Sequence, residues 1–205
     1  MTDWFTAHGL ELFGFVTGGL CVWLAARRNI WNFPLGLLNS SVFIVVFTGA
    51  ALYAAAGLQL VYIALGIAGW IGWQRGAHLR DDRIATLRTP RAAVLPLAVA
   101  AVAMTGLLCW VLDTWTDSTT QLADGATTAV SLTAQFMLNR RWLGSWLVWI
   151  AVDVVYLGVY ASQGLYLSTG LYAVFLVMAT LGYRRWRSSM PRPEGPKAAT
   201  QEASA

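Results

Sequence analysis

Charge is scarce in this 205-residue chain, since Asp, Glu, Lys and Arg make up only 12% of it. Its single lysine, Lys197, lies near the C-terminus, and there are only two histidines and two cysteines. A retinal protein needs a lysine within the membrane for its Schiff base, and most enzymes need clustered catalytic groups. His-Glu-x-x-His, Gly-x-Ser-x-Gly and Walker A motifs are missing too. We therefore expect no enzyme, no ATP-driven pump, and no metal or cofactor.

Hydrophobic residues, in contrast, reach 57% and gather in long runs. A helix needs about 20 mostly apolar residues to cross the hydrocarbon. The runs 33–73 and 142–183 are about twice that length, and their only charge is Asp153. Each run predicts two spans, with turns near 55–57 and 162–164. The sequence predicts an all-α polytopic membrane protein with seven transmembrane helices, at about 9–26, 35–54, 57–74, 92–112, 120–138, 142–161 and 165–183.

The basic residues fall in four short stretches between these spans. The stretches are Arg27–Arg28, Arg75–Arg91, Arg140–Arg141 and Arg184–Lys197. Because cytoplasmic loops retain Lys and Arg, we expect these loops inside, the N-terminus outside and the C-terminus inside. The basic pI then reflects contact with the lipid bilayer, not with nucleic acid. We expect one transmembrane domain over residues 1–187 and a disordered cytoplasmic tail over 188–205.

Two segments at predicted outer turns resemble each other, Tyr53–Leu58 and Tyr160–Leu165. An arginine pair precedes each of the two long runs. We predict that helices 1–3 and 5–7 are parallel copies of one triple-helix unit, in a 3+1+3 plan. Transporters use such repeats, with the substrate site near mid-membrane. The alternative is that short apolar hairpins resemble each other by chance.

The sixth predicted helix carries the clearest candidate site. Six residues repeat there at spacings of 4, 3, 4, 3 and 4, which places them on one face: Trp142, Trp146, Trp149, Asp153, Tyr156 and Tyr160. A carboxylate at mid-membrane is costly, so it faces the bundle interior and has a function or a partner. The alternative is a structural Asp that accepts hydrogen bonds from neighbouring Trp or Asn side chains.

Polar and aromatic residues at helical spacing on the other helices complete this lining. The candidate substrate-binding residues are Asn39, Gln59, Tyr62, Trp70, Gln135, Trp146, Trp149 and Asp153. Aromatic planes, neutral amides and one carboxylate suit a flat, polar small molecule, including a cationic one that gains cation–π attraction. A receptor or scaffold remains an alternative, because a ligand-binding bundle need not move its ligand.

Several of these segments together resemble the PnuC family of vitamin carriers. They are Trp31–Asn39, Gly57–Tyr62, Gly69–Gln74, Thr127–Gln135, Trp146–Asp153 and Gly164–Trp186. Phe33 stands where Trp is often found. The resemblance implies a homotrimer in the bacterial inner membrane, with a fold similar to the SWEET sugar carriers.

The same resemblance implies uptake of nicotinamide riboside by facilitated diffusion, with trapping by a cytoplasmic kinase. Relatives that carry thiamine, riboflavin or deoxynucleosides leave the cargo open. Nicotinamide riboside and thiamine are cations that fit Asp153, whereas riboflavin is neutral. A proton-coupled carrier that uses Asp153 is a further alternative.

Overall fold

The computed structural model describes residues 2–49, 53–77, 85–115 and 121–190. Within these ranges it is helical, apart from loops and one isolated bridge between Leu87 and Trp142. The seven helices are α1 (Thr2–Ala26), α2 (Asn32–Gly49), α3 (Tyr53–Ala77), α4 (Arg91–Trp115), α5 (Gln121–Asn139), α6 (Gly144–Ser162) and α7 (Tyr166–Ser188). The all-α prediction is confirmed, whereas residues 191–205 of the expected tail lie outside the described residues.

The first hairpin turns earlier than the sequence predicts. Because α3 already begins at Tyr53, residues 55–57 lie within its first turns. The predicted turn is wrong because Gly57 does not break the helix, since a helical Gly costs only about 1 kcal/mol relative to Ala. The second hairpin turns at Gly164, whose φ of +70° lies in the left-handed region that favours glycine.

Four helical segments in the described part of the chain are long and apolar enough to cross a membrane. They are Asn32–Gly49, Ala55–Gly76, Arg91–Thr114 and Gly144–Ser162. In α1 the apolar segment is the shorter stretch Val16–Ala26. α5 carries a row of polar residues and α7 ends in arginines, which lowers their apolar character. Seven helices are thus observed, and seven membrane spans remain a prediction.

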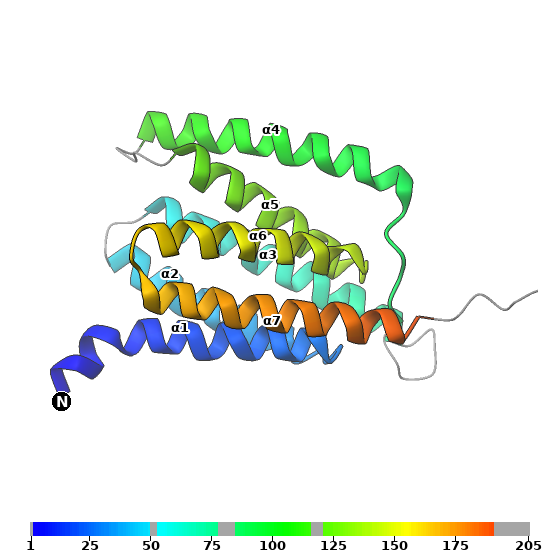
Figure 1. Cartoon of the computed structure of the whole chain (residues 1–205), viewed down its shortest axis with the longest axis horizontal. Helices are drawn as coiled ribbons and strands as arrows, with labels where there is room; N and C mark the ends of the chain where they lie inside the picture. The colour runs from blue at the N-terminus through cyan, green and yellow to red at the C-terminus, as the bar shows by residue number, and fades with distance from the viewer. Residues whose placement is uncertain (1, 50–52, 78–84, 116–120, 191–205) are drawn as a thin grey trace, which may run out of the picture.

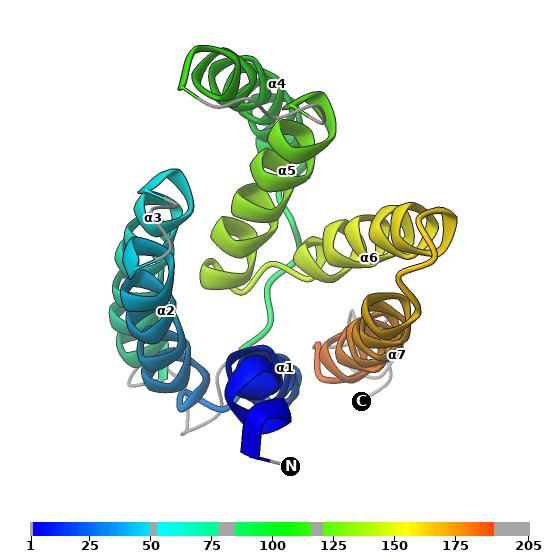
Figure 2. The ribbon, with the colours of Figure 1, turned by 90° about the vertical axis from the view of Figure 1, so that its left-hand side faces the viewer.

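Six of the helices form a closed ring. Each contacts the next in the order α1, α2, α3, α5, α6, α7, and α7 contacts α1 (Figures 1 and 2). α4 lies outside this ring and packs against α5 (Figure 2). The first three helices therefore meet the last three at two places, which we call the α3–α5 junction and the α7–α1 junction.

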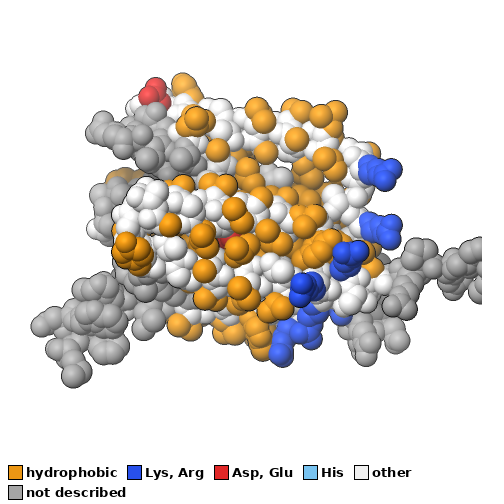
Figure 3. Space-filling model, viewed as in Figure 1, with side chains coloured by type: hydrophobic (Ala, Val, Ile, Leu, Met, Phe, Trp, Pro, Cys, Tyr) orange, Lys and Arg blue, Asp and Glu red, His pale blue; other side chains and the backbone are white. Residues whose placement is uncertain are grey.

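Arginines gather at one end of the helices, which we call the basic end (Figure 3). Arg75 lies in the last turn of α3, Arg91 opens α4, and Arg185 and Arg187 lie in the last turn of α7. Arginine pairs also follow the ends of α1 and α5. This end carries the residues that the sequence analysis assigns to the cytoplasm, and its orientation remains a prediction.

α1 and α5 end at the basic end with the same backbone pattern. Arg28 and Arg141 have φ values of 57° and 61°, unusual for residues other than glycine. Both ends show the paired hydrogen bonds of a Schellman motif, and every participant in α5 lies 113 residues after its counterpart in α1. The bonds, 2.8–3.0 Å long, join Arg28 N–H to Ala25 O, Asn29 N–H to Leu24 O, Arg141 N–H to Leu138 O, and Trp142 N–H to Met137 O.

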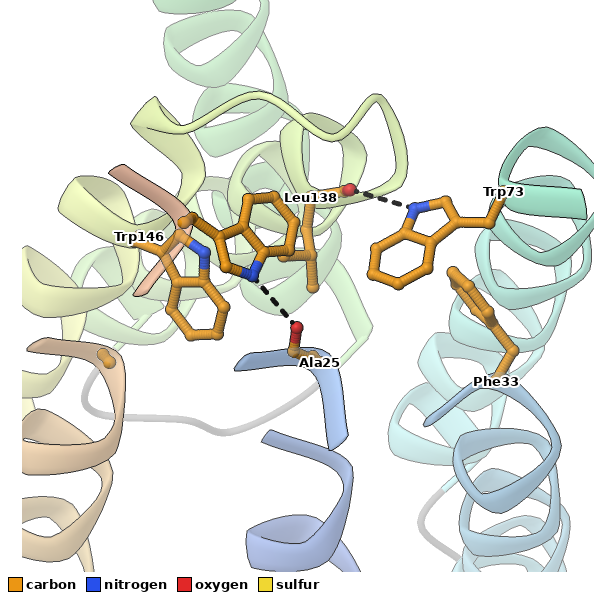
Figure 4. Close-up of a cluster of buried hydrophobic side chains, with 7 residues drawn as sticks. Ala25, Phe33, Trp73, Leu138 and Trp146 are labelled. Atoms are coloured by element: carbon orange, nitrogen blue, oxygen red, sulfur yellow. Dashed lines mark hydrogen bonds between the residues drawn. The ribbon is translucent and has the colours of Figure 1, made fainter. Parts of the chain in front are cut away.

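Two buried tryptophans connect these helix ends across the two junctions. Trp73 Nε1 of α3 donates to Leu138 O of α5 at 3.4 Å, and Trp186 Nε1 of α7 donates to Ala25 O of α1 at 3.2 Å (Figure 4). Both indoles are essentially inaccessible to solvent. The same bond therefore recurs at both junctions, again with participants 113 residues apart.

Each of these indoles meets an aromatic ring edge to face. Phe33 contacts Trp73 at a centroid distance of 5.0 Å, and Trp146 contacts Trp186 at 5.4 Å. With their neighbours these rings form a buried cluster at the basic end, which we call the aromatic plug: Ala25, Phe33, Trp73, Leu138, Trp146, Ala179 and Trp186.

The sequence similarity between residues 53–58 and 160–165 does not mark equivalent places in the fold. Tyr53 opens α3, whereas Tyr160 lies near the end of α6. The residue that opens α7 is Tyr166, 113 positions after Tyr53. The match between residues 53–58 and 160–165 therefore pairs positions that are not equivalent in the fold. It arises because Gly and Tyr recur in similar contexts near several helix ends.

Gly182 provides a test of the aromatic plug. A Cβ atom at this position would lie 2.7 Å from the Trp146 ring, which Trp186 holds from another side. We expect Gly182→Ala to destabilise the protein by about 1–3 kcal/mol through overpacking. Gly170→Ala, in the same helix with open space around it, gains helix propensity of under about 1 kcal/mol. Thermal unfolding in detergent measures both, and equal midpoints would contradict the packing.

Candidate substrate-binding site

The ring encloses a cavity of about 430 Å³. All six ring helices contribute to its wall, and no residue of α4 does. Residues of the aromatic plug, including Phe33 and Trp146, line the cavity toward the basic end. Residues of the plug therefore form the part of the cavity wall nearest the basic end.

Seven of the eight candidate residues from the sequence line this cavity. They are Asn39 of α2, Gln59 and Tyr62 of α3, Gln135 of α5, and Trp146, Trp149 and Asp153 of α6. Trp70, the eighth, is not part of the wall and packs against the aromatic plug instead. The structure thus brings together side chains that are more than 100 residues apart, and their contact with substrate remains a prediction.

Helical spacing explains why seven of the predicted residues line the cavity and why Trp70 does not. On α3, Gln59 and Tyr62 face the cavity, and the same stripe continues through Trp70 into the plug at Trp73. On α6, the stripe enters the cavity at Trp146 and follows it as far as Tyr156. Periodicity therefore identifies the inward face, but it does not tell where the cavity ends and the plug begins.

Among the described residues that line the cavity, Asp153 is the only one with a charged side chain. It lies on α6 and is only 4% exposed. Within the described part of the chain, no hydrogen bond or ion pair to its carboxylate is found. The sequence left open a structural Asp that accepts hydrogen bonds from neighbouring Trp or Asn side chains. No such hydrogen bond is present among the described residues. A carboxylate in this position attracts a cation or a hydroxyl group that enters the cavity.

Two of the cavity amides are positioned by hydrogen bonds to neighbours. Asn39 Nδ2 donates to Thr17 Oγ1 of α1 at 2.5 Å. Gln135 Nε2 donates to Asn139 Oδ1 at 3.1 Å, and Asn139 Nδ2 in turn donates to Leu65 O of α3 at 2.7 Å. Each amide carries two N–H groups and a carbonyl oxygen, so one such bond leaves further capacity for a ligand.

Sequence reasoning missed the contribution of α7 to the wall. Tyr172 and Phe175 line the cavity, and Tyr172 packs against Tyr156 at a centroid distance of 4.7 Å. The 113-residue register supplies a signal that could have found them. Tyr172 and Phe175 lie 113 positions after Gln59 and Tyr62, which also face the cavity.

Two buried polar atoms at the start of α6 have no hydrogen-bond partner among the described residues. They are Ser145 Oγ and Trp146 Nε1. Buried polar groups are usually paired, so each exception calls for an explanation. Trp146 is itself part of the aromatic plug, and Ser145 precedes it in α6.

Comparisons with known proteins agree with this architecture. The chain is 25% identical to the nicotinamide riboside transporter PnuC of Escherichia coli over 88% of its length and 85% of that protein. It is 27% identical to the Neisseria mucosa protein of the same name, over 88% of its length and 72% of that protein. It is 29% identical to the riboflavin/roseoflavin transporter RibM of Streptomyces davaonensis, over 90% of each chain.

A solved structure shows the same fold. The crystal structure of the vitamin B3 transporter PnuC superimposes with a TM-score of 0.71 at 23% identity, over 91% of this chain and 85% of that one. With the four membrane-capable helices, these relatives show a multi-pass membrane protein. The resemblance to the PnuC family is thereby confirmed. The family model described as nicotinamide mononucleotide transporter matches residues 8–188, and the chain belongs to that family.

Proposed function

We propose that this protein carries nicotinamide riboside across the membrane by facilitated diffusion. The observation that supports this most directly is the cavity wall, whose described residues combine aromatic rings and amides with one charged side chain, Asp153. Nicotinamide riboside has a cationic pyridinium ring, a carboxamide and ribose hydroxyls, and each finds a chemical partner in this wall. The names of the Escherichia coli and Neisseria mucosa relatives agree with this cargo.

The wall favours the riboside over its phosphorylated form. The described part of the chain contributes no Lys, Arg or His to the cavity wall. A phosphate group needs such cations, and arginine above all, to compensate its charge in a buried site. Asp153 would repel the phosphate as well. The riboside is therefore the better cargo, even though the family model is described by the mononucleotide.

Within the cavity we assign the pyridinium to Trp149 and to the rings of Trp146 and Tyr62. Of the two α3 aromatics in the candidate set, only Tyr62 lines the cavity. The carboxamide and ribose hydroxyls then contact the remaining polar candidates, Asn39, Gln59, Gln135 and Asp153. Tyr156 and Tyr172 add aromatic surface at the same wall.

We infer that α1–α3 and α5–α7 are two parallel copies of one unit, with a register of 113 residues. The matching Schellman motifs, the paired indole–carbonyl bonds and the two junctions of the ring support this inference. On this plan all seven helices cross the bacterial inner membrane, with the N-terminus outside. The arginines of the basic end then face the cytoplasm.

The two units then move against each other to expose the cavity on alternate sides. Because Trp73 and Trp186 each bond across a junction, both bonds must break when the basic end opens. The closed plug in this structure therefore corresponds to a carrier shut toward the cytoplasm. Opening releases the substrate inside, where a kinase traps it by phosphorylation. The protein assembles as a homotrimer, as the family resemblance implies.

Riboflavin is the second candidate, since RibM has the highest identity among the relatives compared above. A neutral flavin could stack on the same rings, but it gains nothing from a carboxylate in the wall. The role of Asp153 therefore separates the two cargoes. A proton-coupled carrier would also use Asp153, and only that carrier would concentrate its substrate along a pH gradient without a kinase.

Binding to the purified protein tests the cargo. In isothermal titration calorimetry we expect saturable binding of nicotinamide riboside. Thiamine, riboflavin and a deoxynucleoside should bind more weakly or not at all. Trp149→Ala removes a stacking ring and should lower affinity by about 5–150-fold, given about 1–3 kcal/mol for stacking on a base. Asp153→Asn should weaken the binding of the cationic nicotinamide riboside and leave the binding of neutral compounds unchanged. Tighter binding of riboflavin, unaffected by Asp153→Asn, would reassign the substrate.

The gate can be tested with the protein's own cysteine. Cys21 lines the cavity, so its thiol reports access from the basic end in a Cys109→Ser background. Trp73→Phe combined with Trp186→Phe keeps a six-membered aromatic ring at both positions, but it removes both N–H donors and leaves smaller side chains in the plug. Each accepting carbonyl retains its backbone donor, at 2.8 and 2.9 Å.

Two lost bonds of about 1 kcal/mol each would favour opening by about 30-fold. We expect modification of Cys21 by a membrane-impermeant thiol reagent, added at the basic side, to accelerate by up to that factor. Trp110→Phe, on α4 outside the ring and 61% exposed, is the matched control. Equal rates in the double variant and the control would contradict the gate.

A further inference from the structure

A second hollow lies on the outer surface of the ring at the basic end, where α1 meets α7. It has a volume of about 640 Å³, and we call it the α1–α7 groove. Its wall consists of Trp23, Ala26, Arg27, Met178, Leu181, Arg184, Arg185 and Ser188. Three guanidinium groups thus share one groove, and none of the described residues that line it is a carboxylate.

The groove has an apolar part and a charged part in a fixed order. Trp23 lies one turn before Arg27, and Leu181 lies one turn before Arg185. On both helices the apolar side chain is therefore farther from the basic end than the arginine. Trp23 and Leu181 are 42% and 56% exposed. Arg27 stacks over the Trp23 ring at 4.0 Å, which holds its guanidinium at the boundary between the two parts.

We propose that the α1–α7 groove binds an anionic phospholipid. Its phosphate lies among Arg27, Arg184 and Arg185, and an acyl chain follows Trp23 and Leu181. Guanidinium groups bind phosphate oxygens in paired hydrogen bonds, and the cytoplasmic leaflet is rich in anionic lipid. A soluble anion would match the arginines but would leave the apolar part uncovered, so the groove favours the lipid.

The opposite junction lacks this combination. Arg140 lies over Phe136 at 5.3 Å, 113 residues after the Arg27–Trp23 pair. The positions that correspond to Arg184 and Arg185, however, are Ile71 and Gly72, which carry no charge. The proposed site is therefore specific to the α7–α1 junction.

A lipid bound there touches both three-helix units. It would stabilise the α7–α1 junction on the same side as the bond between Trp186 and Ala25. This consequence for transport rests on the proposed function, whereas lipid binding itself does not. Anionic lipid should therefore slow the opening of the basic end, and the two statements can fail separately.

Native mass spectrometry of the full-length protein tests the lipid site. We expect the protein to retain phosphatidylglycerol at least tenfold more than phosphatidylcholine. Arg184→Gln with Arg185→Gln should abolish this preference. The control variant Arg91→Gln with Arg140→Gln loses the same amount of charge at the same end of the protein. It should still prefer phosphatidylglycerol. Equal retention of both lipids by the unaltered protein, or equal loss in both double variants, would overturn the proposal.

One further variant and one competition experiment identify the ligand and guard against an effect of misfolding. Ser188→Glu adds a carboxylate to the rim of the groove, at an exposed position, and should also weaken phosphatidylglycerol retention. Inorganic phosphate at millimolar concentration should not displace the lipid. Displacement by phosphate would identify a free-anion site instead, and cross-linking of Trp23→Cys between two protomers would show that a second copy covers the groove.

Discussion

Two indole–carbonyl bonds hold this fold closed at the basic end. Trp73 bonds to α5 and Trp186 bonds to α1, so each three-helix unit contributes one donor and one acceptor. The acceptors are carbonyls at the ends of α1 and α5, where the chain turns through a left-handed arginine. Removal of either tryptophan would leave a void in the aromatic plug. The ring, its cavity and its closed side therefore depend on this crossed pair.

The chemistry of the cavity lies where the two units differ. In the 113-residue register Gly36 corresponds to Trp149, and Ser40 corresponds to Asp153. All four positions line the cavity, but only the second unit places an aromatic plane and a carboxylate there. Gly36 carries no side chain at the position where the second unit has Trp149. Equivalent positions thus form the frame of the cavity, and on the proposed function the positions that differ determine its selectivity.

The sequence predicts the helical architecture and seven residues of the cavity wall, because both follow from hydrophobic runs and helical periodicity. It places the first turn too late, since Gly57 looks like a helix breaker but lies within α3. It counts Trp70 among the cavity residues because periodicity does not reveal depth along a helix. Tyr172 escapes notice because α7 shows no polar stripe, and only the register derived from the fold links it to Gln59.

The central claim is that the ring moves nicotinamide riboside through its cavity without an energy source. Counterflow in proteoliposomes that contain only the purified protein tests this claim most directly. Labelled nicotinamide riboside should enter vesicles preloaded with the unlabelled compound, settle at equal concentrations on both sides, and respond to no pH gradient. An absence of exchange would contradict the claim that this protein is a carrier of this vitamin. Accumulation driven by a pH gradient would contradict facilitated diffusion.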